Sequence, residues 1–203
     1  MNQVPDPRPT YERAADQMTA LIASVRPELL DAPTPCEEFT IRDLLDHVVA
    51  TTQGFARIGE DGRVTEGVFE QPLQVPDDGW AEAYAKARDG LVAAWLDDAR
   101  LETRYAMGWA DLSGREVLAA ATMDAVAHGW DLARALGRGE GLDEELGEYA
   151  LAVARRMAPG DQRGEGVPFG PVLTAPDGAD AYGRLAAWLG RPADWTPEGR
   201  VVA

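Results

Sequence analysis

The stretch SGREVLAAATMDAVAHGWDLARAL, residues 113–136, predicts the longest helix of this chain and decides the fold class. It opens with Ser113 and, three residues later, Glu116, the pair that forms a capping box by bonding each other's backbone N–H groups. Gly137 follows directly, and glycine is the residue that most often ends a helix. The stretch therefore predicts one helix of more than twenty residues with both ends defined.

Two residues with side chains suited to metal binding lie inside this helix. Asp124 and His128 are four residues apart, so they lie one above the other on a single helix face. The same face carries the apolar residues Val117, Ala121 and Leu132. We therefore expect Asp124 and His128 to point into the protein, where a carboxylate is costly unless it meets a cation, hydrogen bonds or a metal.

The rest of the chain also carries mainly helical signals. Apolar periodicity and helix-breaking residues predict further helices at residues 10–25, 40–59, 80–98, 143–157 and 179–189. Gly54 and Gly59 are expected to weaken and then end the second of these. Residues 60–79 show no sustained period, so we expect a long crossover there. Residues 100–112 are aromatic and are expected to be extended.

Four long helices with a long connection in the middle predict an all-α fold, a four-helix bundle with a crossover. The bundle helices are expected over about residues 10–136, and extra C-terminal helices over about residues 141–203. A chain of 203 residues has the length of one domain. Residues 1–203 are therefore expected to form a single helical domain.

The only other histidine, His47, lies in the helix that begins after Thr40. If that helix is a neighbour of the long one, two imidazoles and one carboxylate converge. Three protein ligands with an open position are the pattern of a catalytic zinc site. Spacing alone leaves other interpretations open: His47 and His128 could be ordinary core or surface histidines, and Asp124 and His128 an ordinary hydrogen-bonded pair.

Composition excludes several other functions. The formal net charge is −16, and no cluster of Lys and Arg is present, which argues against nucleic acid as a partner. Cys36 is the only cysteine, so an intramolecular disulfide and a thiolate-rich zinc site are excluded. No apolar run is long enough to span a membrane, and the N-terminus lacks the features of a signal peptide. We therefore expect no membrane partner and a cytoplasmic location.

Two polar residues follow His128 on the long helix and could influence the site without being metal ligands. Asp131 lies three residues and Arg134 six residues beyond it. Either could orient a ligand or bind substrate; a surface ion pair is the alternative for both. Cys36 is expected to be a small buried residue rather than a reactive thiol.

Three segments resemble one known family. TPCEEFTIRDLLDHVV, residues 34–49, is similar to the "TPC…W-T-V-R-D-L…H" segment of actinobacterial DinB-like proteins, which are relatives of mycothiol-dependent maleylpyruvate isomerase. HGWDLARALG, residues 128–137, is similar to that family's "HGWDLARATG". FGP at residues 169–171 and RLAAWLGR at residues 184–191 resemble its C-terminal end. The resemblance covers nearly the whole chain.

The resemblance implies a DinB-like four-helix bundle that holds a divalent metal, zinc or nickel, through His47, Asp124 and His128. It also implies thiol chemistry, in which a low-molecular-weight thiol such as mycothiol is the nucleophile and attacks an electrophilic small-molecule substrate. The catalytic residues of the protein itself stay unknown, and the metal could equally activate water for hydrolysis. The isomerase has glutamate where this chain has Asp124, and the chain is expected to lack the isomerase's larger C-terminal domain.

Three functions remain open at this stage. The first is a metal-dependent thiol S-transferase or isomerase-like enzyme. The second is a non-catalytic metal-binding bundle with a sensor or scaffold role. The third is a metal-free helical scaffold whose histidines are structural. A homodimer is compatible with each of them.

Overall fold

The computed structural model describes residues 6–37, 39–70, 73–139, 141–161, 163 and 169–197. The two ends of the expected domain, residues 1–5 and 198–203, lie outside the described residues. The fold is all-α, as the sequence predicted. Its elements are α1 (Arg8–Ile22), the short 3₁₀ helix η1 (Pro27–Leu29), α2 (Ile41–Asp61), α3 (Trp80–Ala94), α4 (Asp98–Glu102), β1 (Arg104–Ala106), β2 (Asp111–Ser113), α5 (Gly114–Ala135), α6 (Glu144–Met157) and α7 (Ala181–Trp188).

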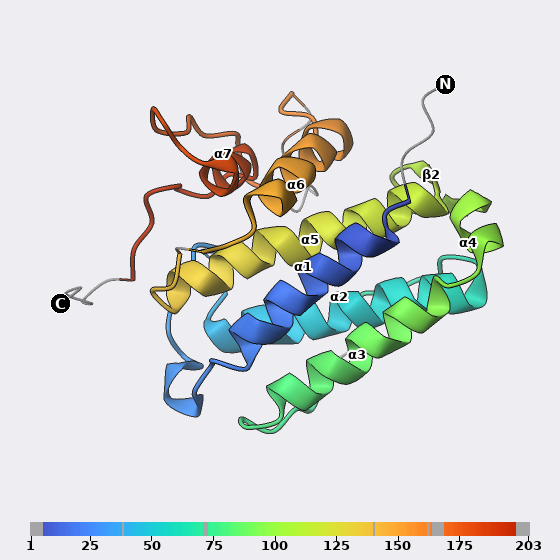
Figure 1. Cartoon of the computed structure of the whole chain (residues 1–203), viewed down its shortest axis with the longest axis horizontal. Helices are drawn as coiled ribbons and strands as arrows, with labels where there is room; N and C mark the ends of the chain where they lie inside the picture. Colours follow the sequence, from blue (N-terminus) through green and yellow to red (C-terminus); the bar gives the residue numbers. More distant parts are fainter. Residues whose placement is uncertain are drawn as a thin grey trace.

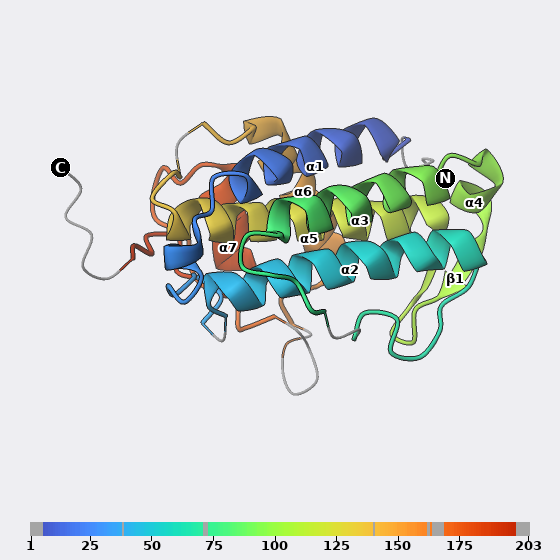
Figure 2. The same ribbon diagram turned by 90° about the horizontal axis from the view of Figure 1, so that it is seen from below.

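Helices α1, α2, α3 and α5 form a four-helix bundle (Figures 1 and 2). Each of them contacts two others, in the cyclic order α1, α5, α2, α3. The colours in Figure 1 show that α1 and α5 run in one direction and that α2 and α3 run in the other. Because α2 and α3 are consecutive and parallel, the chain must return along the bundle between them. The predicted crossover at residues 60–79 is this return, which begins once α2 has ended.

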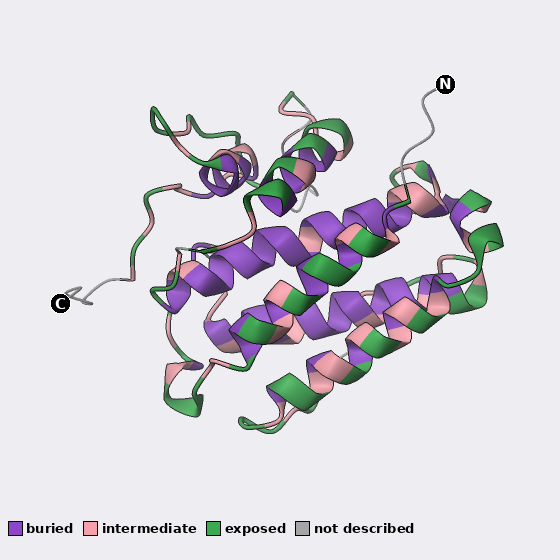
Figure 3. Cartoon of the chain, in the orientation of Figure 1, coloured by how far each residue is buried: buried purple, intermediate pink, exposed green. Residues whose placement is uncertain are grey.

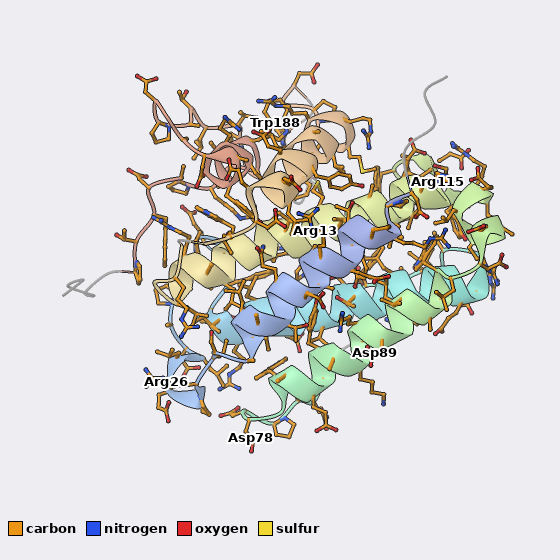
Figure 4. All side chains as sticks on the ribbon, in the orientation of Figure 1. Arg13, Arg26, Asp78, Asp89, Arg115 and Trp188 are labelled. Carbon is orange, nitrogen blue, oxygen red and sulfur yellow. The ribbon has the colours of Figure 1, made fainter. Side chains whose placement is uncertain are left out.

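The long helix α5 is buried along almost its whole length (Figure 3). One side of it faces the bundle, and α6 and α7 pack against the other side. Trp188 of α7 (labelled in Figure 4) ties these two helices together by donating its indole N–H to the Ala158 carbonyl at 3.0 Å. The extra C-terminal helices therefore enclose the helix that carries Asp124 and His128.

The predicted capping box at Ser113 is present, and a second capping box opens α2. The Thr40 side chain accepts a hydrogen bond from the Asp43 backbone, and the Asp43 carboxylate accepts one from the Thr40 backbone at 2.9 Å. Ser113 and Glu116 make the same reciprocal pair at the start of α5. These local bonds satisfy N–H groups that a helix start otherwise leaves unpaired, and they set where α2 and α5 begin.

The expected effect of the glycines in α2 was wrong. The helix continues through Gly54 and Gly59 and ends at Gly62, which adopts a left-handed conformation with φ 66°. A Cβ atom on Gly54 would lie 2.4 Å from the Phe69 ring, and one on Gly59 would lie 2.8 Å from the Trp95 indole. Both glycines therefore allow close packing of neighbouring segments against α2.

The segment after α3 also differs from expectation. Helix α3 ends at Ala94 rather than at residue 98, and Asp97 then caps the short helix α4 by accepting a hydrogen bond from the Ala99 backbone at 2.9 Å. The expected extended stretch is present only in part, as the hairpin of β1 and β2, in which Tyr105 pairs with Leu112. Within the described residues, no helix has the length and apolar character needed to cross a membrane.

Candidate metal centre

The antiparallel contact between α2 and α5 brings His47, Asp124 and His128 together, the convergence expected if these two helices were neighbours. His47 Nε2 lies 3.7 Å from Asp124 Oδ1, and His128 Nε2 lies 3.6 Å from the same oxygen. The two imidazole rings meet edge to face with their centroids 4.7 Å apart. One potential ligand atom from each residue lies within 4.8 Å of the other two.

The two carboxylate oxygens of Asp124 have different neighbours. Oδ1 faces the two imidazoles, whereas Oδ2 lies 3.1 Å from Thr51 Oγ1, whose one hydroxyl proton also lies within reach of the His47 carbonyl, at 2.9 Å. Thr51 lies one helical turn after His47, so α2 supplies both residues from one face. The threonine thus holds the carboxylate with Oδ1 directed at the histidines.

These separations fit a single divalent ion. Two ligand atoms at about 2.1 Å from a tetrahedral zinc are about 3.4 Å from each other. The two N···O separations, 3.6 and 3.7 Å, are close to that value, and the two imidazole nitrogens lie within 4.8 Å of each other. Two imidazole nitrogens and one carboxylate oxygen are also the donors that zinc and nickel accept.

The centre is closed on one side and accessible on the other. His128 is only 7% exposed, whereas the side chains of His47 and Asp124 are 33% and 26% exposed. The ring of Phe39 lies 5.4 Å from that of His47 and covers part of this accessible side. His47 and Asp124 are therefore the partly solvent-exposed members of the group, and His128 is its buried member.

The electrostatics favour a charged carboxylate. Burial alone would raise the pKa of Asp124, but the charge of His128 and the hydrogen bond with His47 outweigh it and lower this pKa to about 2. Burial opposes the charged form of His47, but its hydrogen bond with Asp124 prevails and raises the pKa of His47. In the absence of metal, protonated His47 and the Asp124 carboxylate therefore stabilise each other as an ion pair.

Behind the centre, Asp131 is fully buried and holds the far side of His128. His128 Nδ1 lies 3.0 Å from Asp131 Oδ2. Arg191, which follows α7, places its Nε 2.8 Å from Oδ1 and 3.0 Å from Oδ2 of the same carboxylate. The Arg191 guanidinium is the cationic partner that a buried carboxylate requires.

The other predicted neighbour, Arg134, lies away from this group. Its guanidinium donates to the Trp195 carbonyl, with Nε at 3.0 Å, and lies 5.8 Å from the centre of the Trp130 ring. It therefore links the end of α5 to the C-terminal segment. Cys36 is half-buried rather than fully buried.

Sequence reasoning missed several residues that surround the centre. Thr51 carries a usable signal, because it lies four residues after His47 on the same helix face. Tyr11 of α1 and Tyr84 of α3 are buried, and among the described residues their hydroxyl groups have no hydrogen-bond partner. Burial and the Asp124 charge both raise the pKa of each phenol. Both hydroxyls therefore stay protonated as donors inside the bundle.

Hollows on the surface are found elsewhere. One of about 230 Å³ lies between α1 and α3 and is lined by residues that include Arg88, Val92 and the exposed Leu96. No residue of the centre borders it. Charged side chains such as Arg13 and Asp89 project from the outer surface of α1 and α3 (Figure 4).

The bundle and its centre define a class of protein, a four-helix bundle with two histidines and one aspartate grouped as candidate metal ligands. The chain belongs to the family described as mycothiol maleylpyruvate isomerase N-terminal domain, whose model matches residues 11–133. The match contains all three residues of the centre and Asp131, but it ends well before Arg191.

Two relatives come from Mycobacterium tuberculosis. They are the uncharacterized protein Rv0738 of strain H37Rv and the uncharacterized protein MT0763 of strain CDC 1551. Each is 33% identical over 186 residues, which span 92% of this chain and 98% of the relative. No solved structure gave a significant match.

Proposed function

We propose that this protein binds one divalent metal ion, zinc or nickel, through His47, Asp124 and His128, and that it acts as a thiol-dependent S-transferase or isomerase-like enzyme. The observation that carries the proposal is the position of Asp124 Oδ1, 3.7 Å from one imidazole nitrogen and 3.6 Å from the other. Membership of a family named for a mycothiol-dependent isomerase supports a small thiol as the second component.

The chemistry follows from the number and type of donors. Three protein ligands leave a position for an exogenous group, and a divalent metal there would stabilise a bound thiol as the nucleophilic thiolate. In the proposed S-transfer the S–H proton would pass to solvent and the sulfur would form a bond with an electrophilic carbon of the substrate, while the bond from that carbon to its leaving group breaks and the leaving group departs as an anion with the electron pair. The other residues of the protein would orient the ligands. Thr51 contacts Asp124, Asp131 contacts His128, and the Phe39 ring lies beside His47.

The proposal is tested first by metal content. Wild-type protein is freed of metal with a chelator and titrated with zinc and with nickel, and the bound metal is measured by elemental analysis. We expect about one ion per chain in the wild type and a loss of tight binding in His47→Ala and in His128→Ala, because each removes one of three ligands. Circular dichroism checks that each variant remains helical.

A matched pair of aspartate variants controls for charge. Asp124→Asn removes the bridging carboxylate, whereas Asp89→Asn removes an exposed carboxylate on α3. Only the former should lose metal. If the wild type binds neither metal, or if His47→Ala and His128→Ala retain the wild-type affinity, the proposed centre is wrong.

Thiol dependence needs a separate measurement. Mycothiol is added to the zinc-loaded protein together with an aryl halide electrophile, and formation of the thioether is followed. Turnover that requires both the metal and the thiol supports the enzyme. Metal binding without any thiol affinity would instead support the non-catalytic bundle with a sensor or scaffold role.

A further inference from the structure

We propose that Arg191 is a positioning residue for the metal centre: through Asp131 it holds His128 in the tautomer whose Nε2 lone pair faces Asp124 and His47. The inference rests on the proposed metal-binding function, and it adds a residue that lies outside the family match at residues 11–133. The C-terminal segment would then be a working part of the centre, in addition to covering α5.

The tautomer follows from the hydrogen bonds around Asp131. Arg191 Nε, which can only donate, contacts both carboxylate oxygens, at 2.8 and 3.0 Å, the arrangement of an arginine–carboxylate ion pair. A charged carboxylate can only accept hydrogen bonds. At 3.0 Å from Asp131 Oδ2, His128 Nδ1 must therefore be the donor. A neutral imidazole that carries its proton on Nδ1 presents a lone pair at Nε2, the atom that faces Asp124.

Burial makes this arrangement rigid. The Asp131 side chain is 0% exposed and the Arg191 side chain only 9% exposed, so water cannot replace either partner. A buried carboxylate that loses its cationic partner is strongly destabilised, and it would move or find another donor. In the described structure Arg191 is held as well, because Nη1 lies 3.5 Å from the Leu189 carbonyl. The end of α7 thus fixes the guanidinium, and the guanidinium fixes Asp131.

A purely structural role for the ion pair would predict something different. An ion pair that only joins the C-terminal segment to α5 would affect stability but leave the His128 proton and the metal affinity unchanged. Arg184 of α7, seven residues before Arg191, provides that comparison, since it pairs with Glu148 of α6 at the surface. The variants Arg191→Met and Arg184→Met therefore both remove an arginine that ties down this part of the chain, but only the first contacts Asp131.

The first measurement uses metal-free protein, so that it does not depend on metal binding. Histidine is labelled with ¹⁵N, and long-range ¹H–¹⁵N spectra at alkaline pH identify which ring nitrogen carries the proton. The chain has two histidines, and His47→Gln assigns the signals. We expect His128 to carry its proton on Nδ1 in the wild type and in Arg184→Met. In Asp131→Asn the amide N–H can donate to Nδ1, so the proton is expected on Nε2, as for a buried aspartate behind a catalytic histidine.

The second measurement is the zinc dissociation constant, together with the absorption spectrum of the cobalt-substituted protein. We expect affinity to fall about 10- to 100-fold in Asp131→Asn and by about tenfold or more in Arg191→Met, the range found when partners behind metal ligands are removed. Arg191→Lys keeps the charge and should restore most of the affinity. Arg184→Met should match the wild type in both affinity and cobalt spectrum.

The inference is overturned if Arg191→Met keeps the wild-type His128 tautomer and binds zinc within about twofold of Arg184→Met. Should Arg191→Met fail to fold, Asp131→Asn and Arg191→Lys carry the same test. If the wild type binds no zinc while Arg191→Met still shifts the His128 proton, the metal proposal fails and the positioning of His128 stands. No change in either readout refutes the positioning role alone, provided that the wild type binds zinc.

Discussion

Thr51 Oγ1 lies 3.1 Å from Asp124 Oδ2, across the contact between α2 and α5, and this bond leaves Oδ1 for the two histidines. Thr51→Val keeps the shape of the side chain but removes the donor. We expect zinc affinity to fall by about tenfold, because the carboxylate loses the group that orients it. The pKa of Asp124 should also rise, since the hydrogen bond from Thr51 helps to lower it. Isothermal titration with zinc measures the first effect.

The neighbouring threonine is a matched control. Thr52 is equally buried, but its hydroxyl donates to the Val48 carbonyl of its own helix at 2.7 Å. Thr52→Val therefore makes the same chemical change one residue away from the centre, and zinc affinity should stay within about twofold of the wild type. Equal losses in the two variants would mean that the Thr51 bond to Asp124 does not orient a metal ligand.

Stability of the metal-free protein should depend on pH through His47. The pKa of His47 is raised above its ordinary value of 6.5, so its ion pair with Asp124 stabilises the fold fully below pH 6.5 and fades as pH rises through the folded-state pKa. The pKa of Asp124 is lowered from 3.8 to about 2, so its contribution is present above pH 3.8 and is lost as pH falls toward 2. The difference in Tm between wild type and His47→Gln should therefore be larger at pH 6 than at pH 8.5 in the presence of a chelator.

Zinc should reverse this pH dependence. Metal binding requires neutral imidazoles, so a proton on His47 competes with the ion. In excess zinc the Tm difference between wild type and His47→Gln is expected to grow from pH 6 to pH 8.5, because the stabilisation of the folded state by a ligand rises with the logarithm of its affinity. The same pH trend with zinc and with chelator would contradict the assignment of His47 as a ligand.

Much of the fold was predictable because its signals are local. The capping boxes at Thr40 and Ser113 need only residues three apart, and they set the starts of α2 and α5. The grouping of His47 with Asp124 and His128 was expected from the family resemblance, because spacing alone leaves open whether those two helices are neighbours in the bundle. Their role as metal ligands stays a prediction.

The remaining features depend on residues far apart in the sequence. Arg191 reaches Asp131 across sixty residues, and no periodicity connects a residue after the last helix with one inside α5. Helix α2 continues past Gly59, and the glycine there makes room for the Trp95 indole. The position of Trp95 is determined only when the helices of the bundle pack together. Such contacts arise from tertiary packing, which overrides local propensity.

The close contact at Gly59 gives a further prediction. A Cβ atom there would lie 2.8 Å from Trp95 Nε1 and 3.1 Å from the Ala94 Cβ, and the indole cannot simply move, because it is buried and donates to the Phe55 carbonyl at 3.0 Å. Gly59→Ala should therefore lower the free energy of unfolding by about 1–3 kcal/mol through overpacking. Urea denaturation measures it.

Gly90, in the interior of α3, is the matched control. The nearest atom to a Cβ placed there is the Ala56 Cβ at 4.0 Å, an ordinary contact distance. Gly90→Ala gains helix propensity without a clash and should raise the free energy of unfolding by about 0.4–1 kcal/mol. Opposite signs for the two substitutions would show that α2 and α3 approach most closely at Gly59, near the end of α2 away from His47. If Gly59→Ala were as stabilising as Gly90→Ala, Trp95 could not be packed against Gly59 as described.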